Sequence, residues 1–383
     1  MQDLILEVKG ESPQATLDEF FRSLLERGVL DALLLPLETG GGAAVAHALV
    51  LDPSKLRATA ALAPVSPFNA AGLVSCLTFG DQQPGRLGVV LRSCESRALV
   101  ELVKLKQASM KSLLVIGVDC AGIFEPDHYC RMVREGLLSQ ASWIERENGV
   151  PAGAPLRPSC RICPGVTTPH ADLHIGWIGM NGKRFLIRSS DGLAKELIEK
   201  IGLAAGAEPA GRVAILEEMR NKRLSAREEC LADVGRNVGS VAALSDLLTT
   251  CLRCYNCREA CPVCFCRQCV FTGETFDYRP DKYFQLAGKK GLLKMPAGTL
   301  LFHITRINHM GMSCVGCGQC ESACPGGLPL TALFQYFGSQ AASVFDYIAG
   351  RDPDEKLPLS TYREVELEPR QGRLQTLLRF EVK

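Results

Sequence analysis

The first 200 residues alternate short apolar runs with segments whose apolar positions recur at helical spacing. Residues 30–35, 87–92 and 113–118 are apolar runs of strand length. Residues 16–27 and 95–107 instead carry apolar side chains at the i, i+3, i+4 spacing of a helix packed on one face. Strands that alternate with helices in this way predict an α/β domain with a mainly parallel sheet.

The alternation of strands and helices ends with residues 171–201, and the pattern changes after them. Residues 171–188 are expected to form two strands joined by a turn at Asn181-Gly182, and residues 193–201 a helix. The Gly- and Pro-rich residues 202–212 indicate a linker, and helices are expected over 213–223 and 238–249. We therefore predict three parts: an α/β domain over 1–205, a mostly helical domain of bacterial-ferredoxin type over 206–345, and an irregular tail over 346–383 that straps onto a partner.

Composition and charge narrow the class of protein. The chain has 383 residues with 43 Lys and Arg against 42 Asp and Glu, a net charge of +1 that gives no basic surface for nucleic acid. The N-terminus has no signal-peptide pattern, and no apolar run reaches the length of a membrane helix. We expect a soluble, cytoplasmic protein, in which the 18 cysteines are metal ligands rather than disulfides.

Two cysteine motifs share one spacing, and each ends in Cys-Pro. The spacing C-x2-C-x2-C-x3-C-P is that of two-cluster ferredoxins, where the fourth cysteine of each motif binds the other cluster. One predicted [4Fe-4S] cluster is therefore held by Cys251, Cys254, Cys257 and Cys324, and a second by Cys314, Cys317, Cys320 and Cys261. Zinc is the alternative, but zinc sites normally use pairs of cysteines rather than triplets.

Further cysteines lie close to these motifs. Cys264, Cys266 and Cys269 could form part of another site with Cys230 as a distant fourth ligand, or they could be packed thiols. His303 and His309 are expected to be packing or capping residues rather than ligands.

A second group of cysteines belongs to the α/β domain. Cys94 and Cys120 each follow a predicted strand, so both should lie at the carboxyl edge of the sheet, where α/β folds bind ligands. Cys160 and Cys163 form a CxxC pair in a loop. The four could hold a third [4Fe-4S] cluster; alternatively Cys94 and Cys120 are core thiols and the pair is a redox or zinc site.

Three segments favour the cluster through a family resemblance. The segments GVVLRSCESRAL around Cys94, VIGVDC ending at Cys120, and CRIC with the following ADLHIG resemble the beta-subunit family of deazaflavin-coenzyme-reducing hydrogenases and formate dehydrogenases. The resemblance implies a cluster on Cys94, Cys120, Cys160 and Cys163 beside a bound FAD. Arg92 and Arg97 are candidates to bind the flavin phosphates or to tune the cluster.

Two functions follow from these motifs. The first is an electron-transfer subunit of an anaerobic oxidoreductase, relaying electrons between a flavin and a formate dehydrogenase, hydrogenase or heterodisulfide-reductase-like partner. The alternative is a flavin-free iron–sulfur wire between two redox subunits, with no catalytic site of its own.

Overall fold

The computed structural model describes residues 1–10, 12–80, 85–145 and 154–362. Within them, eight strands form one sheet in the order β3-β2-β4-β5-β6-β7-β1-β8. The strands are β1 (Gln2–Glu7), β2 (Ala32–Thr39), β3 (Ala44–Val50), β4 (Leu87–Leu91), β5 (Leu113–Val118), β6 (Leu173–Gly176), β7 (Arg184–Ser189) and β8 (Ala204–Ala205). Strands β2, β4, β5 and β6 run parallel and the outer pairs are antiparallel, which confirms the predicted fold class.

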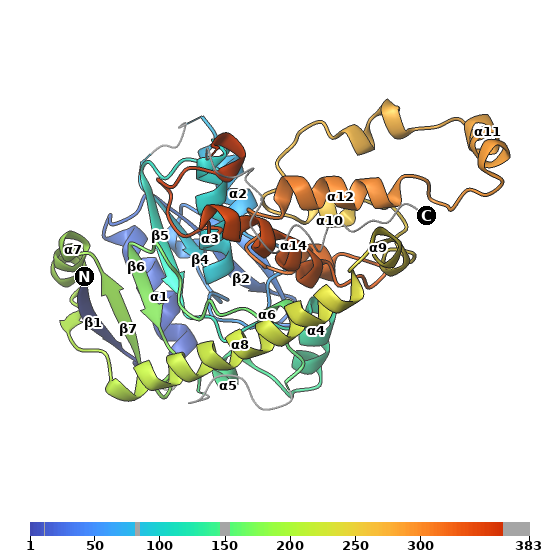
Figure 1. Ribbon diagram of the computed structural model, residues 1–383. Coiled ribbons are helices and arrows are strands. Elements are labelled where there is room, and N and C mark those ends of the chain that lie inside the picture. The colour runs from blue at the N-terminus through green and yellow to red at the C-terminus, as the bar shows by residue number, and fades with distance from the viewer. Residues whose placement is uncertain (11, 81–84, 146–153, 363–383) are drawn as a thin grey trace.

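Helices cover the sheet and then form the C-terminal region (Figure 1). The first group comprises α1 (Pro13–Glu26), α2 (Ala71–Thr78), α3 (Ser93–Lys104), α4 (Pro126–Arg134), α5 (Gln140–Ile144), α6 (Pro158–Arg161) and α7 (Asp191–Ile201). The second comprises α8 (Ala210–Asn237), α9 (Val241–Leu247), α10 (Asn256–Glu259), α11 (Pro280–Lys290), α12 (Thr299–Met310), α13 (Gln319–Ser322) and α14 (Leu330–Phe345). None of the described helices is long and apolar enough to cross a membrane.

The two faces of the sheet contribute to two different hydrophobic cores. Val90 of β4 packs into a core with α1, whereas its neighbours Val89 and Leu91 point to the opposite face, as successive strand residues must. On that second face α3 shares its core with residues of the cysteine-rich region, including Phe302 and Leu330. The cysteine-rich helices therefore share one hydrophobic core with α3 and this face of the sheet.

The predicted linker is wrong in its last residues, 210–212, which are helical. Helix α8 begins at Ala210, inside that segment, and continues without a break to Asn237. Figure 1 shows it running from the edge of the sheet to the C-terminal helices. Its only buried residues are Arg212 and Arg223, both held by hydrogen bonds. One rigid helix thus connects the two halves of the chain.

The segment after α14 straps onto this chain's own α/β unit. Tyr347 donates its hydroxyl hydrogen to the buried carboxylate of Glu101 on α3, at 2.6 and 2.7 Å from its two oxygens. The Gly350 amide donates to the same carboxylate at 2.8 Å, and Lys104 bridges to Glu355 at 3.4 Å. The rest of the predicted tail, residues 363–383, lies outside the described residues.

Candidate iron–sulfur centres

Four cysteines from separate segments line one cavity at the carboxyl edge of the parallel strands. Cys94 lies in the first turn of α3 after β4, and Cys120 follows β5. Cys160 and Cys163 come from α6 and the residues after it, and they complete the set, which we call centre 3. Gly122, at φ +101°, lets the backbone after Cys120 turn tightly beside Cys160.

The thiols of centre 3 need positive charge to ionise. Burial raises the pKa of Cys160 to about 12, so its thiolate is unfavourable unless a cation or a cluster compensates it. Arg223 of α8 donates to the carbonyl oxygens of Cys120 and Ala121, the latter at 2.6 Å. The donor set and its charged surroundings fit an iron–sulfur cluster.

Asp119 anchors α8 directly beside centre 3. Its buried carboxylate accepts hydrogen bonds from Arg212 at 2.6 and 2.9 Å, from His174 at 2.8 Å, and from the amides of Trp177 and Ile178. Burial alone would raise the pKa of Asp119, but these hydrogen bonds and the Arg212 charge hold it well below its usual range. His174 is thus one of the groups that hold this carboxylate in place.

The first ferredoxin-type motif forms a second cavity. Cys251, Cys254, Cys257 and Cys324 all line it, and we call this set centre 1. Arg253 and Tyr255 adopt left-handed backbone conformations (φ 52° and 62°), which curl the loop around the cavity. The Arg253 amide approaches Cys251 Sγ at 3.4 Å.

Two side chains of α12 contact the sulfurs of centre 1. His303 Nε2 lies 3.3 Å from Cys251 Sγ, and burial with the Arg306 charge lowers the pKa of His303 to about 4. At neutral pH the ring is thus uncharged and can donate one hydrogen bond. Arg306 donates to Cys257 Sγ at 3.1 Å and to the Cys257 carbonyl at 3.0 Å. The sequence expectation of a packing role for His303 missed this sulfur contact.

Replacing Arg306 with methionine should lower the reduction potential of centre 1. Reduction adds negative charge, which a buried guanidinium and its hydrogen bond stabilise. We expect a shift on the order of 50 mV, since about 1 kcal/mol corresponds to roughly 40 mV for one electron. An EPR-monitored redox titration measures it, with Arg306→Lys restoring part of the shift and exposed Arg236→Met as control. An unchanged potential at full iron content would contradict this role.

The second motif surrounds a third set of thiols. Cys314, Cys317 and Cys320 lie around Cys261, and the pKa of Cys320 is raised by burial and by the proximity of Cys261, Cys314 and Cys317. We call these four centre 2. Helices α10 and α13, which carry the two motifs, pack against each other, so the fourth cysteine of the first motif faces the second.

Contacts between the centres fix their order. Cys317 of centre 2 lines the cavity of centre 3, together with Gly316 and Gln319. On the other side, Arg306 bonds Cys257 of centre 1 and lies near Cys261 and Cys320 of centre 2. Centre 2 therefore lies between centres 3 and 1.

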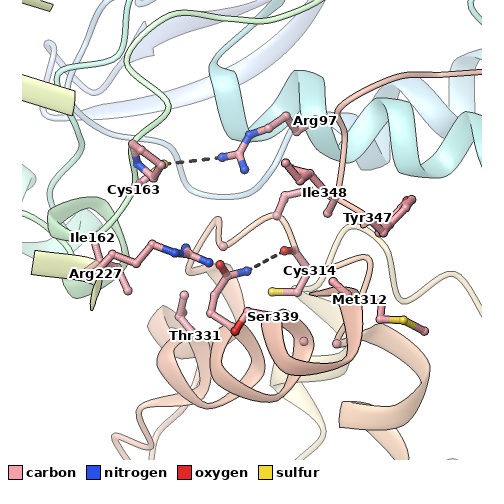
Figure 2. A pocket seen from close by; sticks show the side chains of 18 of the residues that line it. Arg97, Ile162, Cys163, Arg227, Met312, Cys314, Thr331, Ser339, Tyr347 and Ile348 are labelled. Atoms are coloured by element: carbon pink, nitrogen blue, oxygen red, sulfur yellow. Dashed lines mark hydrogen bonds between the residues drawn. The ribbon is translucent and has the colours of Figure 1, made fainter. Parts of the chain in front are cut away.

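A larger groove lies between centres 3 and 2 (Figure 2). It has a volume of about 430 Å³, and Cys163 and Cys314 line it from opposite sides. Arg97 points to Cys163, 3.6 Å from its Sγ, and Arg227 reaches in from α8. Arg92, by contrast, is buried and donates to the carbonyl oxygens of Ala63 and Val65. Of the two predicted arginines, Arg97 is thus the one that contacts a centre 3 sulfur.

The remaining cysteines do not form a comparable set. Cys264 lies near Cys266 and Cys269, whereas the charged neighbours of Cys230 are Glu321, Asp233 and Arg227. Within the described ranges, no three His, Cys, Asp or Glu side chains converge as the ligands of a single metal ion do. The structure does not bring Cys230 to the other three.

Among the described residues, buried polar atoms without partners occur at the start of α1, on α5 and on β3. Gln14 and Gln140 both donate to the Thr59 carbonyl, which leaves the side-chain oxygen of each buried and unpaired. Both ring nitrogens of His47 are also buried without partners, and burial lowers the pKa of His47. Unsatisfied buried groups are rare and ask for an explanation. These atoms fit a polar ligand such as a flavin ring.

Comparisons with known proteins agree with the motifs. Residues 247–328 match the family of 4Fe-4S dicluster domains. The chain is 26% identical to the F420-dependent formate dehydrogenase subunit beta of Methanocaldococcus jannaschii, over 70% of this chain and 74% of that protein. It is 25% identical to the F420-dependent formate dehydrogenase 1 subunit beta of Methanococcus maripaludis, over 91% and 93%.

A solved structure is also similar. A chain of the F420-reducing [NiFe] hydrogenase complex from Methanosarcina barkeri matches with a TM-score of 0.46 and 16% identity, covering 61% of this chain and 92% of that one. The resemblance predicted from the segments around Cys94, Cys120 and Cys160 is confirmed. The chain is thus similar along most of its length to beta subunits of F420-dependent formate dehydrogenases, and residues 247–328 match a 4Fe-4S dicluster domain.

Proposed function

We propose that this chain is an electron-transfer subunit in which centres 3, 2 and 1 each hold one [4Fe-4S] cluster, in that spatial order. The observation that carries the proposal is the shared wall between centres 3 and 2, because Cys317 lines the centre 3 cavity. Electrons would pass from the α/β unit (1–205) through the middle cluster to the outer end of the helical unit (206–345). Each cluster accepts one electron at a potential set by its surroundings.

The relay would connect other subunits of an oxidoreductase. Homology to formate dehydrogenase beta subunits supports a formate dehydrogenase partner, with a hydrogenase or heterodisulfide-reductase-like partner as the alternatives. We place the protein inside the cell, because air-sensitive clusters on reduced cysteines suit a reducing compartment.

A flavin at the α/β end is the second part of the proposal. When bound, a flavin converts two-electron hydride transfer into single-electron steps. The unpaired oxygens of Gln14 and Gln140 and the ring of His47 support it, because they offer hydrogen-bonding atoms that no other described residue uses. These residues would hold and orient the ring beside centre 3, with Arg92 near His47.

Metal and flavin content test both parts in one preparation. Anaerobically purified protein should contain about twelve irons for three clusters, and Cys163→Ala should retain about eight. Acid extraction should release flavin from the wild-type chain. Cys76→Ala, an exposed thiol outside all three centres, is the matched control.

The outcomes separate the alternatives. Unchanged iron in Cys163→Ala would refute the third cluster. Twelve irons without extractable flavin would refute the flavin and leave the flavin-free wire.

A further inference from the structure

We propose that residues 277–297, together with the groove at their base, form a docking surface for an acidic one-electron carrier protein that exchanges electrons with centre 1. We call these residues the arm. The proposal rests on the proposed function, because it takes centre 1 as the outer end of the relay. It adds the place of contact and the chemistry of the partner.

Centre 1 comes to the molecular surface beside the arm. A groove of about 420 Å³ is lined by Cys251 of centre 1 and by Lys294, Met295 and Pro296 of the arm. Cys254, another centre 1 cysteine, is itself exposed, and the neighbouring Leu252 is 66% exposed. A protein seated in this groove would bring its redox centre close to the cluster ligands.

The arm presents apolar side chains that the other described residues leave uncovered. Helix α11 has no buried residue, and Figure 1 shows it at the end of a projecting loop, far from the sheet. Phe284, Leu292 and Met295 are 79%, 71% and 62% exposed. Large apolar groups exposed together mark an interaction site more often than an ordinary surface.

The charge of the arm identifies the partner. It contains five basic residues and two acidic ones, although the whole chain is nearly neutral. The basic residues are Arg279, Lys282, Lys289, Lys290 and Lys294. A positive patch accelerates encounter with a negatively charged protein. Electron-transfer complexes are also among the smallest protein interfaces, so an arm and one groove offer sufficient contact.

The arm is fastened to the loop of centre 1, which couples docking to the cluster. Arg253 of that loop hydrogen bonds the carbonyl of Ala297, and its guanidinium lies over the Phe276 ring at 5.9 Å. A partner bound to the arm would therefore be held at a fixed position relative to Cys251 and Cys254.

The test uses an acidic plant-type [2Fe-2S] ferredoxin as the probe. Reduced ferredoxin is mixed with the full-length, cluster-loaded protein, and cluster reduction is followed by stopped-flow absorbance. In a variant with Lys282, Lys289, Lys290 and Lys294 changed to Glu, we expect the rate to fall about tenfold or more at low ionic strength. The difference should shrink as salt screens the charges. Phe284→Ser with Met295→Ser should slow the reaction at every ionic strength.

Matched controls and outcomes decide the proposal. Lys9, Lys55, Lys195 and Lys222, all exposed and outside the arm, are changed to Glu in the control variant, which should keep the wild-type rate. Equal rates in the arm variant and wild type, or equal losses in both variants, would overturn docking at the arm. So would sedimentation showing that the arm joins two copies of this chain. Iron missing from centre 1 in the wild type would instead refute the proposed function.

Discussion

Replacing Cys261 with alanine should remove the middle cluster. The two clusters that remain should then no longer be magnetically coupled. The variant should lose about four of about twelve irons. Although Cys261 ends the first motif, it lies among Cys314, Cys317 and Cys320 of the second, so its loss should destroy centre 2 and spare centre 1. Because centre 2 lies between the others, its removal should leave two distant paramagnets in the reduced protein.

EPR spectroscopy of the fully reduced protein measures this effect. Neighbouring reduced clusters broaden each other's signals, so the wild type should give a complex spectrum and Cys261→Ala the sum of two simple ones. Cys163→Ala and Cys254→Ala each remove an end cluster and should retain a coupled pair. If Cys261→Ala abolishes centre 1, or if Cys163→Ala gives uncoupled signals, the crossed ligation or the order of centres is wrong.

Parts of two cysteine sets could be predicted from short-range geometry. The loop between Cys251 and Cys257 is too short to reach far, and Cys94 and Cys120 follow neighbouring parallel strands, whose carboxyl ends meet at one edge. In the structure Cys251 and Cys257 line one cavity, and Cys94 and Cys120 line another. The position of centre 3 beside centre 2 could not be predicted, because it depends on a core shared between α3 and distant residues such as Phe302 and Leu330.

Helix α8 shows the limit of hydrophobic periodicity. That method finds a helix by its apolar stripe, but the residues that α8 buries are Arg212 and Arg223. In the sequence, an arginine that will be buried cannot be distinguished from one that will face solvent, so the buried face of such a helix gives no apolar stripe. The tail was predicted to strap onto a partner, whereas Tyr347 attaches it to Glu101 of this chain's own α3.

Buried or half-buried arginines accompany each of the three centres. Arg223 and Arg97 lie at centre 3, Arg227 lies near Cys163 and Cys314, and Arg306 lies between centres 2 and 1. A thiolate-ligated cluster carries negative charge that increases on reduction, and fixed guanidinium groups favour the reduced state. The same side chains that fasten α8 and α12 to the fold thus also support a relay of reducible centres.

Asp119→Asn should be the most damaging single change away from the cysteines. The amide keeps the shape of the carboxylate but removes its charge, leaving Arg212, 2% exposed, with Glu208 as its remaining acidic partner. Breaking a buried ion pair on one side costs about 3–5 kcal/mol. Denaturant unfolding at neutral pH should therefore show a clearly lower midpoint. Asp3→Asn, in the partly exposed pair with Arg188, is the matched control and should cost about 1 kcal/mol or less.

The pH dependence of this difference identifies the carboxylate charge as its cause. Because the pKa of Asp119 is lowered on folding, its ionised form stabilises the fold at pH values above the unfolded pKa of about 3.9. That contribution is lost as the pH falls through the folded pKa. The gap in unfolding free energy between wild type and Asp119→Asn should thus stay constant from about pH 5 to pH 8 and narrow only in stronger acid. An absent gap would show that Arg212 does not depend on Asp119.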